Sequence, residues 1–555
     1  MGDVQADTRV GINLEFILPV LKLAGPIQQF TSEEGVTRHF SIGRLTWALQ
    51  NNFSHNDLLD YFSYFTIEAI AREINKEVEG IPAVFYAVAT NDENIVRSWI
   101  EHGGDVNAIG LKSRIPLLAF AILRGDSIHA DTTTIVTTLL SLGANTSVIP
   151  KAFYSPFLRD LPASGPDTVE LTDIEDENKR WCTESIRPQL AAAINLSQRY
   201  FLEKYLNKVQ PSVRFREAAA KLNATSLFSL HFLMIGQNIA LKMLVERLLS
   251  YLILPSSKPL VLFFAGPSGH GKSELGKHLG NLLSLKIQRI DMTGMRYETD
   301  LFGPSAPYVG CEKGSLLNNF LARMSRKRAI VFLDEFERST TEVMNSLLIP
   351  FDEGRCTDRR TREPIDCSKI IWILASNALD PIITNFANTS DICGLQDDNR
   401  MAASISDLQL QLMKGLKARF GFPLAGRIPV VIPFLPFSAD EQVVIVHKYL
   451  LRLARDVRGP VSLPKRLIGN IILRMHRDAT LCKALAEGGY DIDIGARSLE
   501  AAVKARVEGL LVQRYLESNS SLGEDQRTEE YLVDVDNAGQ IVIFRNHEHC
   551  NEHDT

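Results

Sequence analysis

The chain has 555 residues, of which 45% are hydrophobic and 23% are charged, and its formal net charge is −6 at pH 7. This length exceeds what one hydrophobic core supports, so we expect about two to four domains. The composition excludes wholesale disorder, and the slightly acidic balance predicts no nucleic-acid partner.

The cysteines and the N-terminal residues indicate the expected compartment. The seven cysteines form no C-x-x-C pair, so we expect neither a zinc site nor a disulfide framework, and a reducing environment. The first residues include Asp3 and Asp7 and lack the basic and apolar regions of a secretory signal, and no arginine-rich transit segment is evident. No apolar run reaches the length of a membrane span. We therefore expect an intracellular, cytoplasmic protein without a membrane span.

Residues 1–78 have apolar spacing typical of helices and carry no chemical signature. The next region, 79–149, holds two copies of one pattern, in which Pro82 and Pro116 lie 34 positions apart (116 − 82) and each copy ends in a glycine-containing turn. This pattern resembles ankyrin repeats, whose period is about 33 residues. An ordinary pair of helical hairpins is the alternative. The resemblance implies an all-α, ankyrin-like N-terminal region with a surface for a protein partner and no catalytic role.

The region 150–225 is predicted to contain a linker followed by helices. Four prolines between 150 and 166 precede an acidic stretch at 170–177, a composition typical of an exposed linker. Apolar residues at helical spacing follow from 189 to 223, interrupted at Pro211.

A phosphate-binding loop is predicted directly after the apolar run at 261–265. Residues 266–273 read G-P-S-G-H-G-K-S, which matches G-x-x-x-x-G-K-S between a strand and a helix. The glycines let backbone N–H groups wrap phosphate oxygens at a helix N-terminus. We expect Lys272 to reach the outer phosphates of ATP and Ser273 to hold Mg²⁺. The predicted nucleotide-binding residues of this loop are Gly266, Pro267, Ser268, Gly269, His270, Gly271, Lys272 and Ser273.

Two further apolar runs end in polar residues. The run 329–333 is followed by Asp334 and Glu335, and the run 370–375 is followed by Asn377 after one serine. Parallel α/β sheets place their chemistry at the carboxyl ends of their strands. We expect Asp334 to support Mg²⁺, Glu335 to polarise the attacking water, and Asn377 to hydrogen-bond that water and the γ-phosphate. Taken alone the acidic pair would fit a plain turn, and the phosphate loop beside it favours the catalytic interpretation.

Together these segments resemble the AAA+ superfamily, and within it the Clp branch, closest to the second ATPase module of ClpB-type disaggregases. The resemblance runs from about 230 to 544 and rests also on Ile235, Gly236 and Gln237 beside the expected adenine site, I-D-M at 290–292, D-E-F-E-R at 334–338, D-E-G-R-C-T-D at 352–358 and G-A-R at 495–497. It implies an α/β P-loop NTPase (AAA+) core with a parallel sheet at 226–432 and a small Clp-type C-terminal domain with a helical lid at 433–545. Alternating runs at 531–536 and 540–544 predict a terminal hairpin, and the tail 546–555 is expected to be disordered.

The same resemblance gives roles to further residues. Arg497 looks like the sensor arginine that contacts the γ-phosphate of its own subunit. Arg427, in G-R-I-P where the family has N-R-I-D, looks like the arginine finger that enters the neighbouring subunit's site, and Arg419 is the alternative. Tyr308 and Val309, in P-Y-V-G where the family has G-Y-V-G, resemble the aromatic pore loop that grips an extended polypeptide.

These roles imply an ATPase that requires Mg²⁺ and works as a protein unfoldase or disaggregase. Its homo-oligomeric ring, a hexamer in the family, would thread unfolded or aggregated clients through a pore. The single P-loop and the missing heptad segment are similar to ankyrin-bearing, single-ATPase ClpB homologues of mitochondria, so a mitochondrial location is the alternative. Two other functions stay open. One is a nucleotide-switched ankyrin scaffold, against which an intact Glu335 argues, and the other is an unfoldase partner of a protease, for which 392–395 is the nearest docking-loop candidate.

Overall fold

The computed structural model describes residues 17–22, 39–110, 114–206, 212–222, 224–254, 258–305, 307–308, 310–389, 398–461, 467–517 and 528–545. These residues fall into two compact units. Unit 1 holds the described residues of 1–209, 443–487 and 502–555, and unit 2 holds those of 210–442 and 488–501. The predicted small domain at 433–545 is thus divided, because most of its helices and all its strands pack with the N-terminal half of the chain.

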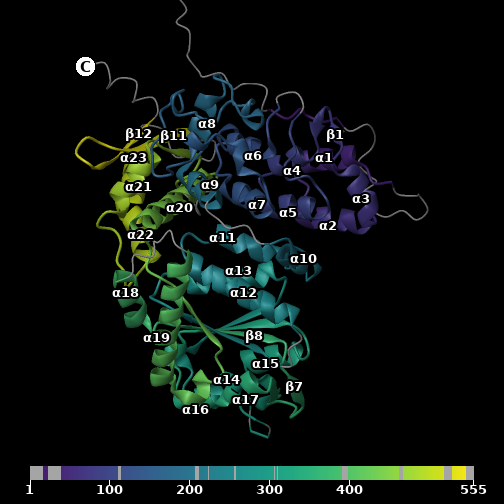
Figure 1. Cartoon of the computed structure of the whole chain (residues 1–555), viewed down its shortest axis with the longest axis vertical. Coiled ribbons are helices and arrows are strands. Elements are labelled where there is room, and N and C mark those ends of the chain that lie inside the picture. Colours follow the sequence, from purple (N-terminus) through teal and green to yellow (C-terminus); the bar gives the residue numbers. More distant parts are fainter. Residues whose placement is uncertain are drawn as a thin grey trace, which may run out of the picture. The chain divides into compact units, whose positions relative to one another are not determined.

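Short helices form the N-terminal part of unit 1 (Figure 1). They are α1 (Ile42–Gln50), α2 (His55–Ser63), α3 (Ile67–Glu73), α4 (Val84–Ala89), α5 (Glu93–Glu101), α6 (Leu117–Ser127) and α7 (Thr133–Ser141). Polar side chains fix where several of them begin: Ser54 and Asp57 form a capping box at α2, and Asp92 caps α5. The strands β1 (Glu77–Val78) and β2 (Ile81–Pro82) form an antiparallel pair ahead of α4.

The region 79–149 consists of two successive helix pairs, α4 with α5 and α6 with α7. α4 packs against α6 and α5 against α7, so the pairs stack on each other. Pro82 lies just ahead of the first pair, and Pro116 is the N-cap of α6 in the second. Trp99 of α5 is fully buried, and a Cβ on Gly104 in the following turn would lie 2.5 Å from its ring. The predicted helical pairs are present, and their assignment as ankyrin repeats stays a prediction.

The region 150–185 is not the exposed linker that its prolines predicted. Its backbone is made of turns, loops and the short 3-10 helices Lys151–Phe153 and Glu177–Lys179, but the side chains of Phe153, Tyr154 and Trp181 are buried. The indole N–H of Trp181 donates to Val148 O at 2.9 Å. Apolar residues between the prolines bury enough surface to keep this irregular segment folded.

The rest of unit 1 joins helices and strands that are far apart in the sequence. It contains α8 (Arg187–Ala193), α9 (Leu196–Leu206), most of α20 (Ala439–Arg458), α21 (Asp478–Ala486), a π-helical turn at Lys504–Glu508 and α23 (Gly509–Leu516). Its sheet has the order β10 (Ile471–Met475), β11 (Glu529–Val535) and β12 (Ile541–Arg545), with β10 parallel and β12 antiparallel to β11. The predicted terminal hairpin is confirmed, and β10 was not predicted.

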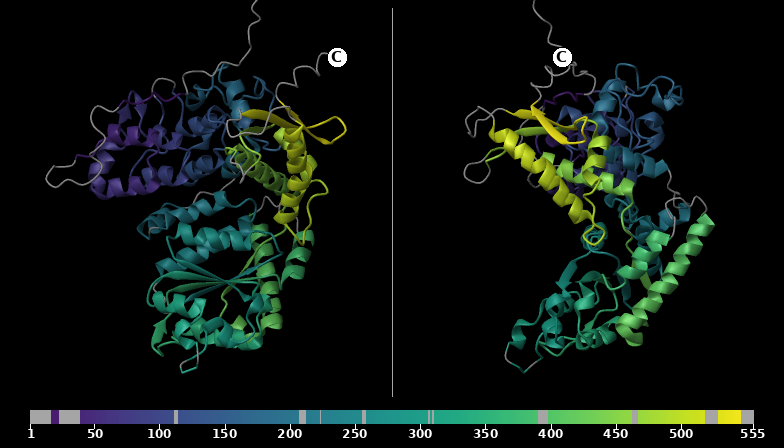
Figure 2. Two further views of the ribbon diagram at one scale, coloured as in Figure 1. Left: turned by 180° about the vertical axis from the view of Figure 1, so that it is seen from behind. Right: turned by 90° about the vertical axis from the view of Figure 1, so that its left-hand side faces the viewer.

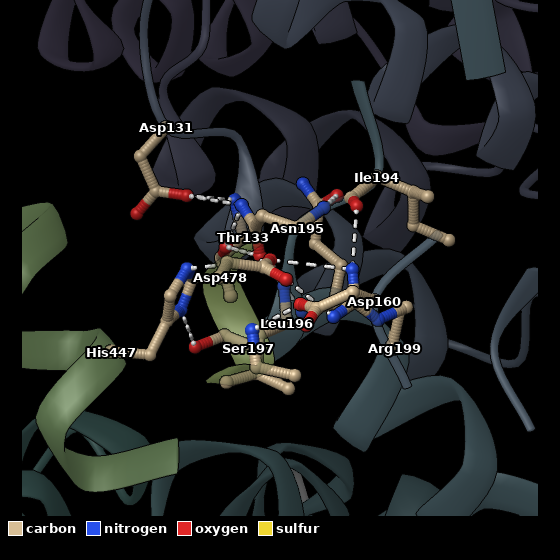
Figure 3. A network of polar contacts seen from close by, with 12 residues as sticks. Asp131, Thr133, Asp160, Ile194, Asn195, Leu196, Ser197, Arg199, His447 and Asp478 are labelled. Carbon is tan, nitrogen blue, oxygen red and sulfur yellow. Dashed lines mark hydrogen bonds and ion pairs between the residues drawn. The ribbon is translucent and has the colours of Figure 1, made fainter. Parts of the chain in front are cut away.

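A buried polar network connects α9, α20 and α21 (Figure 3). Arg199 forms an ion pair with Asp478 at 2.6 Å and also donates to Ile194 O at 3.2 Å. Ser197 Oγ and His447 Nδ1 are hydrogen-bonded at 2.7 Å. Ser197 is 3% exposed and His447 is 0% exposed, so this serine, histidine and aspartate serve packing and offer no reachable nucleophile.

Unit 2 is built on a five-stranded parallel sheet with the order β4-β5-β8-β3-β9. The strands are β3 (Leu260–Ala265), β4 (Ile287–Asp291), β5 (Ala329–Asp334), β8 (Ile370–Ser376) and β9 (Val430–Pro433). Every residue of β3, β5 and β8 is buried, which explains their nearly continuous apolar sequences. The predicted P-loop α/β fold with a parallel sheet is confirmed.

Helices cover both faces of this sheet (Figures 1 and 2). α12 (Asn238–Ile253) and α13 (Lys272–Leu282) pack on the face that carries Leu262 and Phe264, whereas α15 (Leu316–Arg323), α17 (Leu348–Asp352), α18 (Asp380–Thr389) and α19 (Asp398–Ala425) pack on the face of Phe263 and Trp372. Unit 2 also contains α10 (Val213–Lys221), α11 (Leu230–Leu233), α14 (Glu298–Phe302), α16 (Thr341–Ser346), the hairpin β6 (Arg355–Thr357) and β7 (Pro364–Asp366), the start of α20, and the start of α22 (Ala496–Val503). Within the part of the chain that the structure describes, no helix is both long and apolar enough to cross a bilayer.

Candidate functional site

The polar residues predicted from the strand ends meet at the carboxyl edge of the sheet in unit 2. β3 leads into the loop 266–271, β5 ends at Asp334, and β8 ends one residue before Asn377. In the β3–β8 ladder the last residue of β3 is level with the last residue of β8. β5 is the other neighbour of β8, so the topology brings the loop, the acidic pair and the asparagine to one edge.

Lys272, the first residue of α13, is buried in the loop. Its ammonium group donates to Gly266 O, to Pro267 O at 2.9 Å and to Asn377 Oδ1 at 2.6 Å. Burial lowers the pKa of Lys272 to about 8, although the carboxylates around it, Asp380 foremost, act to raise it. None of these three hydrogen-bond acceptors is charged. A buried cation held in this way favours an anionic ligand such as a phosphate.

Ser273 and Asp334 form the candidate metal site. Ser273 Oγ donates to Asp334 Oδ2 at 2.9 Å, and Arg289 Nη2 donates to the same oxygen at 2.5 Å. Mg²⁺ binds hydroxyl and carboxylate oxygens next to substrate phosphates. The donor set therefore fits Mg²⁺, and the guanidinium of Arg289 shows that the carboxylate accepts a cationic partner at this position.

Glu335 occupies a strained turn at the end of β5. Its backbone has φ 55°, a left-handed conformation that residues other than glycine rarely adopt. Burial raises the pKa of Glu335 above its ordinary value, and the neighbouring Glu337 carboxylate acts in the same direction. Glu337 also accepts the backbone N–H of Asn377 at 3.3 Å. A carboxylate with a raised pKa accepts a proton more readily near neutral pH, as a general base must.

The C-terminal segment of unit 2 closes over the phosphate loop. Gly269 has φ 71°, and a Cβ there would lie 1.9 Å from Ile494 O, so no other residue fits at this position. Ala496 donates its N–H to Gly269 O at 3.1 Å. Arg497 follows in the first turn of α22 and is exposed. The predicted sensor arginine thus lies next to a direct backbone contact with the loop.

The predicted adenine-side residues 235–237 lie at the start of α12. The side-chain amide of Gln237 forms two hydrogen bonds with the backbone of Leu435. Gln237 Nε2 donates to Leu435 O at 2.7 Å, and the Leu435 N–H donates to Gln237 Oε1 at 3.0 Å. A Cβ on Gly236 would lie 2.8 Å from the carboxyl carbon of Glu441, and Ile235 is buried. These contacts fix the segment against the chain that follows β9.

His270 takes a structural position within the loop. Its Nδ1 is 2.7 Å from Ser268 O, its Nε2 is 2.9 Å from the Tyr490 hydroxyl, and its ring stacks on Phe437 with centroids 4.8 Å apart. Burial lowers the pKa of His270. Because both ring nitrogens are engaged, the part of His270 that remains for a phosphate is its backbone N–H.

The two candidate arginine fingers make different contacts within their own subunit. Arg427 donates to Leu348 O at 3.1 Å and pairs with Asp352 at 3.2 Å. Arg419 is exposed on α19 and lies 3.4 Å from Glu337 O. The sequence favours Arg427, with Arg419 as the alternative, and the role of either arginine as a finger stays a prediction.

The predicted pore-loop tyrosine is exposed. The side chain of Tyr308 is 72% exposed, and Val309 lies outside the described residues. The loop is held at its start by Arg359, which donates to Ser305 Oγ at 2.7 Å. An exposed aromatic ring on an anchored loop is available for contact with another polypeptide.

Three residues at this edge had no role predicted from the sequence. Arg289 is an isolated basic residue on β4, and Glu337 entered only as part of D-E-F-E-R at 334–338. Asp380 lies at the start of α18, and burial raises its pKa to about 7. One of its carboxyl oxygens has no hydrogen-bond partner among the described residues. Only the fold brings these residues to the site.

A phosphate-binding loop after the first strand of a parallel sheet, a buried lysine and a serine–aspartate pair define a P-loop nucleotide-binding protein. Residues 258–431 match the family model "AAA domain (Cdc48 subfamily)". The chaperone protein ClpB of Chlamydia trachomatis serovar D is 30% identical over 296 residues, which are 52% of this chain and 31% of that protein. The mitochondrial disaggregase of Homo sapiens is 31% identical over 279 residues, 46% of this chain and 38% of that protein.

These matches support the predicted ClpB-like AAA+ ATPase module in this part of the chain, and similarity to that class implies nucleotide binding. The chain spans about a third of the length of the ClpB relatives that it matches. A solved structure of Hsp104 with ATPγS and FITC casein aligns with a TM-score of 0.43 and 19% identity, over 78% of this chain and 69% of that chain.

Proposed function

We propose that this chain is an ATP- and Mg²⁺-dependent protein unfoldase or disaggregase, a chaperone that threads unfolded or aggregated polypeptides through the pore of a homo-oligomeric ring, with a hexamer as the expected ring. The observation that carries the proposal is the convergence of Lys272, the Ser273–Asp334 pair and Glu335 on one sheet edge. The ClpB and mitochondrial disaggregase relatives support the choice of a protein substrate.

The chain's own groups supply the parts needed for phosphoryl transfer to water. The backbone N–H groups of the loop and the Lys272 ammonium would hold the phosphates, and Ser273 and Asp334 would hold Mg²⁺, which would neutralise phosphate charge. Glu335 takes a proton from the attacking water, and Asn377 orients that water. Asn377 Oδ1 accepts a hydrogen bond from Lys272 at 2.6 Å. Movement of Lys272 toward a phosphate would free the Asn377 amide to orient the water.

Oligomerisation follows from the proposed role of Arg427. A guanidinium from the neighbouring subunit would neutralise charge that builds on the transferred phosphoryl group. Mixing two inactive variants tests this role. Subunits with Arg427→Ala keep an intact Glu335, and subunits with Glu335→Gln keep an intact Arg427, so a mixture is expected to regain ATP turnover at shared interfaces. A mixture that stays inactive would assign Arg427 to its own subunit, and the same pair built with Arg419→Ala tests the alternative.

Tyr308 is proposed to transmit the work of hydrolysis to a polypeptide client. The experiment measures ATP turnover and unfolding of a model client such as casein for wild type and Tyr308→Ala. We expect the variant to keep its basal turnover and to lose client unfolding and client-stimulated turnover. Tyr297→Ala is the matched control, because Tyr297 is 60% exposed in the same unit and lies outside the loop. Equal loss in both variants would contradict a specific grip by Tyr308.

Two other functions are distinguished by the same measurements. A nucleotide-switched scaffold, in which the helix pairs of unit 1 bind a protein partner, predicts ATP binding without turnover. An unfoldase partner of a protease predicts turnover together with client degradation once a protease ring is added, and its docking-loop candidate at 392–395 lies outside the described residues.

The mitochondrial relatives support a mitochondrial location as the alternative to the cytoplasm.

A further inference from the structure

Two cysteines lie side by side at the base of the β6–β7 hairpin in unit 2. The Sγ atoms of Cys356 and Cys367 are 3.5 Å apart. Cys356 pairs with Ile365 in the antiparallel ladder, and Cys367 donates its N–H to Gly354 O at 2.6 Å, which continues the ladder by one step. Residues two apart on a strand share a face, so the two thiols lie diagonally opposite on the same face of the hairpin.

The surroundings of the two thiols differ. Cys367 is 0% exposed within the core of unit 2, whereas Cys356 is partly exposed and packs against that core. The hydrogen bond to Cys356 and burial both raise the pKa of the Cys367 thiol above its ordinary value. Cys356 is the sulfur that a dissolved reagent can reach, and Cys367 lies behind it in the core.

We propose that Cys356 and Cys367 are a reversible thiol–disulfide site, which takes a low-molecular-weight disulfide such as oxidised glutathione as its co-reactant. The two sulfurs must approach by about 1.5 Å to reach the length of a disulfide bond, about 2.0 Å. Both thiols sit on one short hairpin, so rotation of two side chains and a small adjustment of the backbone supply this movement. Within the described residues, this is the pair of cysteines that the fold brings together.

The exchange balances without any further oxidant. The Cys356 thiolate attacks one sulfur of oxidised glutathione, the reagent's S–S bond breaks, and one glutathione leaves as a thiolate that takes up a proton. Cys367 then gives up its proton and attacks Cys356 Sγ, and the second glutathione leaves in the same way. Two protein thiols are oxidised to one disulfide, and one reagent disulfide is reduced to two thiols.

The hairpin connects this site to the pore loop, and this consequence rests on the proposed function. At the hairpin tip, Arg359 donates to Ser305 Oγ at 2.7 Å and forms an ion pair with Glu298. A disulfide at the base restricts motion of the tip and of the loop that carries Tyr308. We expect the oxidised protein to lose client-stimulated turnover while its basal turnover is kept. Client-stimulated turnover is measured separately from formation of the disulfide. If oxidation leaves turnover unchanged, the link to the pore loop fails, and the thiol–disulfide site itself is still tested by peptide mapping.

The test treats the native full-length chain with oxidised glutathione, blocks the remaining thiols, and maps the products by mass spectrometry after trypsin. Arginines at 359, 360 and 362 lie between the two cysteines, so trypsin separates them unless a disulfide joins the peptides. In wild type we expect the joined peptides, with both thiols lost together and restored by dithiothreitol. Cys367→Ser is expected to retain glutathione on Cys356, and Cys356→Ser to keep Cys367 reduced.

Cys311→Ser is the matched control, because Cys311 is also partly exposed in unit 2. It is expected to give the same joined peptides as wild type. Wild-type protein that carries glutathione on Cys356 while Cys367 stays a free thiol would overturn the proposal. Joining of either residue to Cys311 would overturn it as well. Both of these contrary outcomes are measured on the wild-type chain, so the test remains valid even where a variant folds poorly.

Discussion

Acidification below about pH 6.5 is expected to destabilise unit 1 through His447. The ring is fully buried, and its Nε2 has no hydrogen-bond partner among the described residues. Burial lowers its pKa to about 4, although Asp478 and Asp131 act to raise it, and Arg199 adds to the lowering. The folded chain therefore resists protonation of His447 over a range in which the unfolded chain accepts a proton.

The sign and size follow from the two pKa values of this histidine. An unfolded histidine has a pKa of about 6.5, so as the pH falls the unfolded state binds the proton first and gains stability relative to the folded state. Values of about 6.5 and about 4 give a loss of about 1 kcal/mol at pH 6, about 2 kcal/mol at pH 5, and about 3 kcal/mol below pH 4. The lowered pKa of Asp478 acts in the same direction at still lower pH.

The assay compares wild type with His447→Gln, whose side-chain amide can still bond Ser197 but does not titrate. Urea unfolding is followed by tryptophan fluorescence in a Trp372→Phe background, which removes the tryptophan of unit 2. Any loss caused by the substitution itself is measured at pH 7.5 and subtracted. The stability of wild type relative to the variant should fall by about 2 kcal/mol between pH 7.5 and pH 5. An equal pH dependence for both proteins would refute the reasoning.

Three predictions concern the nucleotide site. Arg289→Gln removes a half-exposed guanidinium that competes with Mg²⁺ for Asp334. The half-saturating Mg²⁺ concentration for turnover should therefore fall about fivefold, equivalent to about 1 kcal/mol. An unchanged Mg²⁺ dependence would argue against competition. Gly269→Ala places a Cβ 1.9 Å from Ile494 O. Calorimetric titration with ADP should show that the affinity of the variant is reduced more than tenfold. An affinity equal to that of wild type would contradict this prediction. The pH profile of kcat/KM should fall on the alkaline side near pH 8, because Lys272 loses its charge there. It should fall on the acid side at a pH above the ordinary carboxyl pKa, because the pKa of Glu335 is raised. A flat profile would exclude both groups from the catalysed reaction.

The sequence was most informative where one segment contains its own signal. The phosphate loop 266–273 is recognisable because its backbone must wrap an anion, and β3, β5 and β8 are recognisable because strands buried on both faces read as apolar runs. The order of strand, loop and polar residue then predicts which edge carries the chemistry. These local signals are enough to locate most of the candidate site.

The features that escaped prediction depend on contacts between distant segments. Arg199 and Asp478 are 279 positions apart, and nothing local marks them as partners. Arg289 needed the β4–β5 pairing to reach Asp334. The linker prediction for 150–185 failed because proline content reports on backbone regularity, whereas burial of Trp181 depends on what packs over it.

The most direct test of the central claim measures ATP binding and steady-state turnover for wild type and Glu335→Gln. Glu335 is predicted to take the proton of the attacking water, so the variant should bind ATP as tightly as wild type and lose more than about 99% of its turnover. Wild-type protein that binds ATP without hydrolysing it, or a variant that hydrolyses ATP at the wild-type rate, would contradict the motor function proposed for this chain.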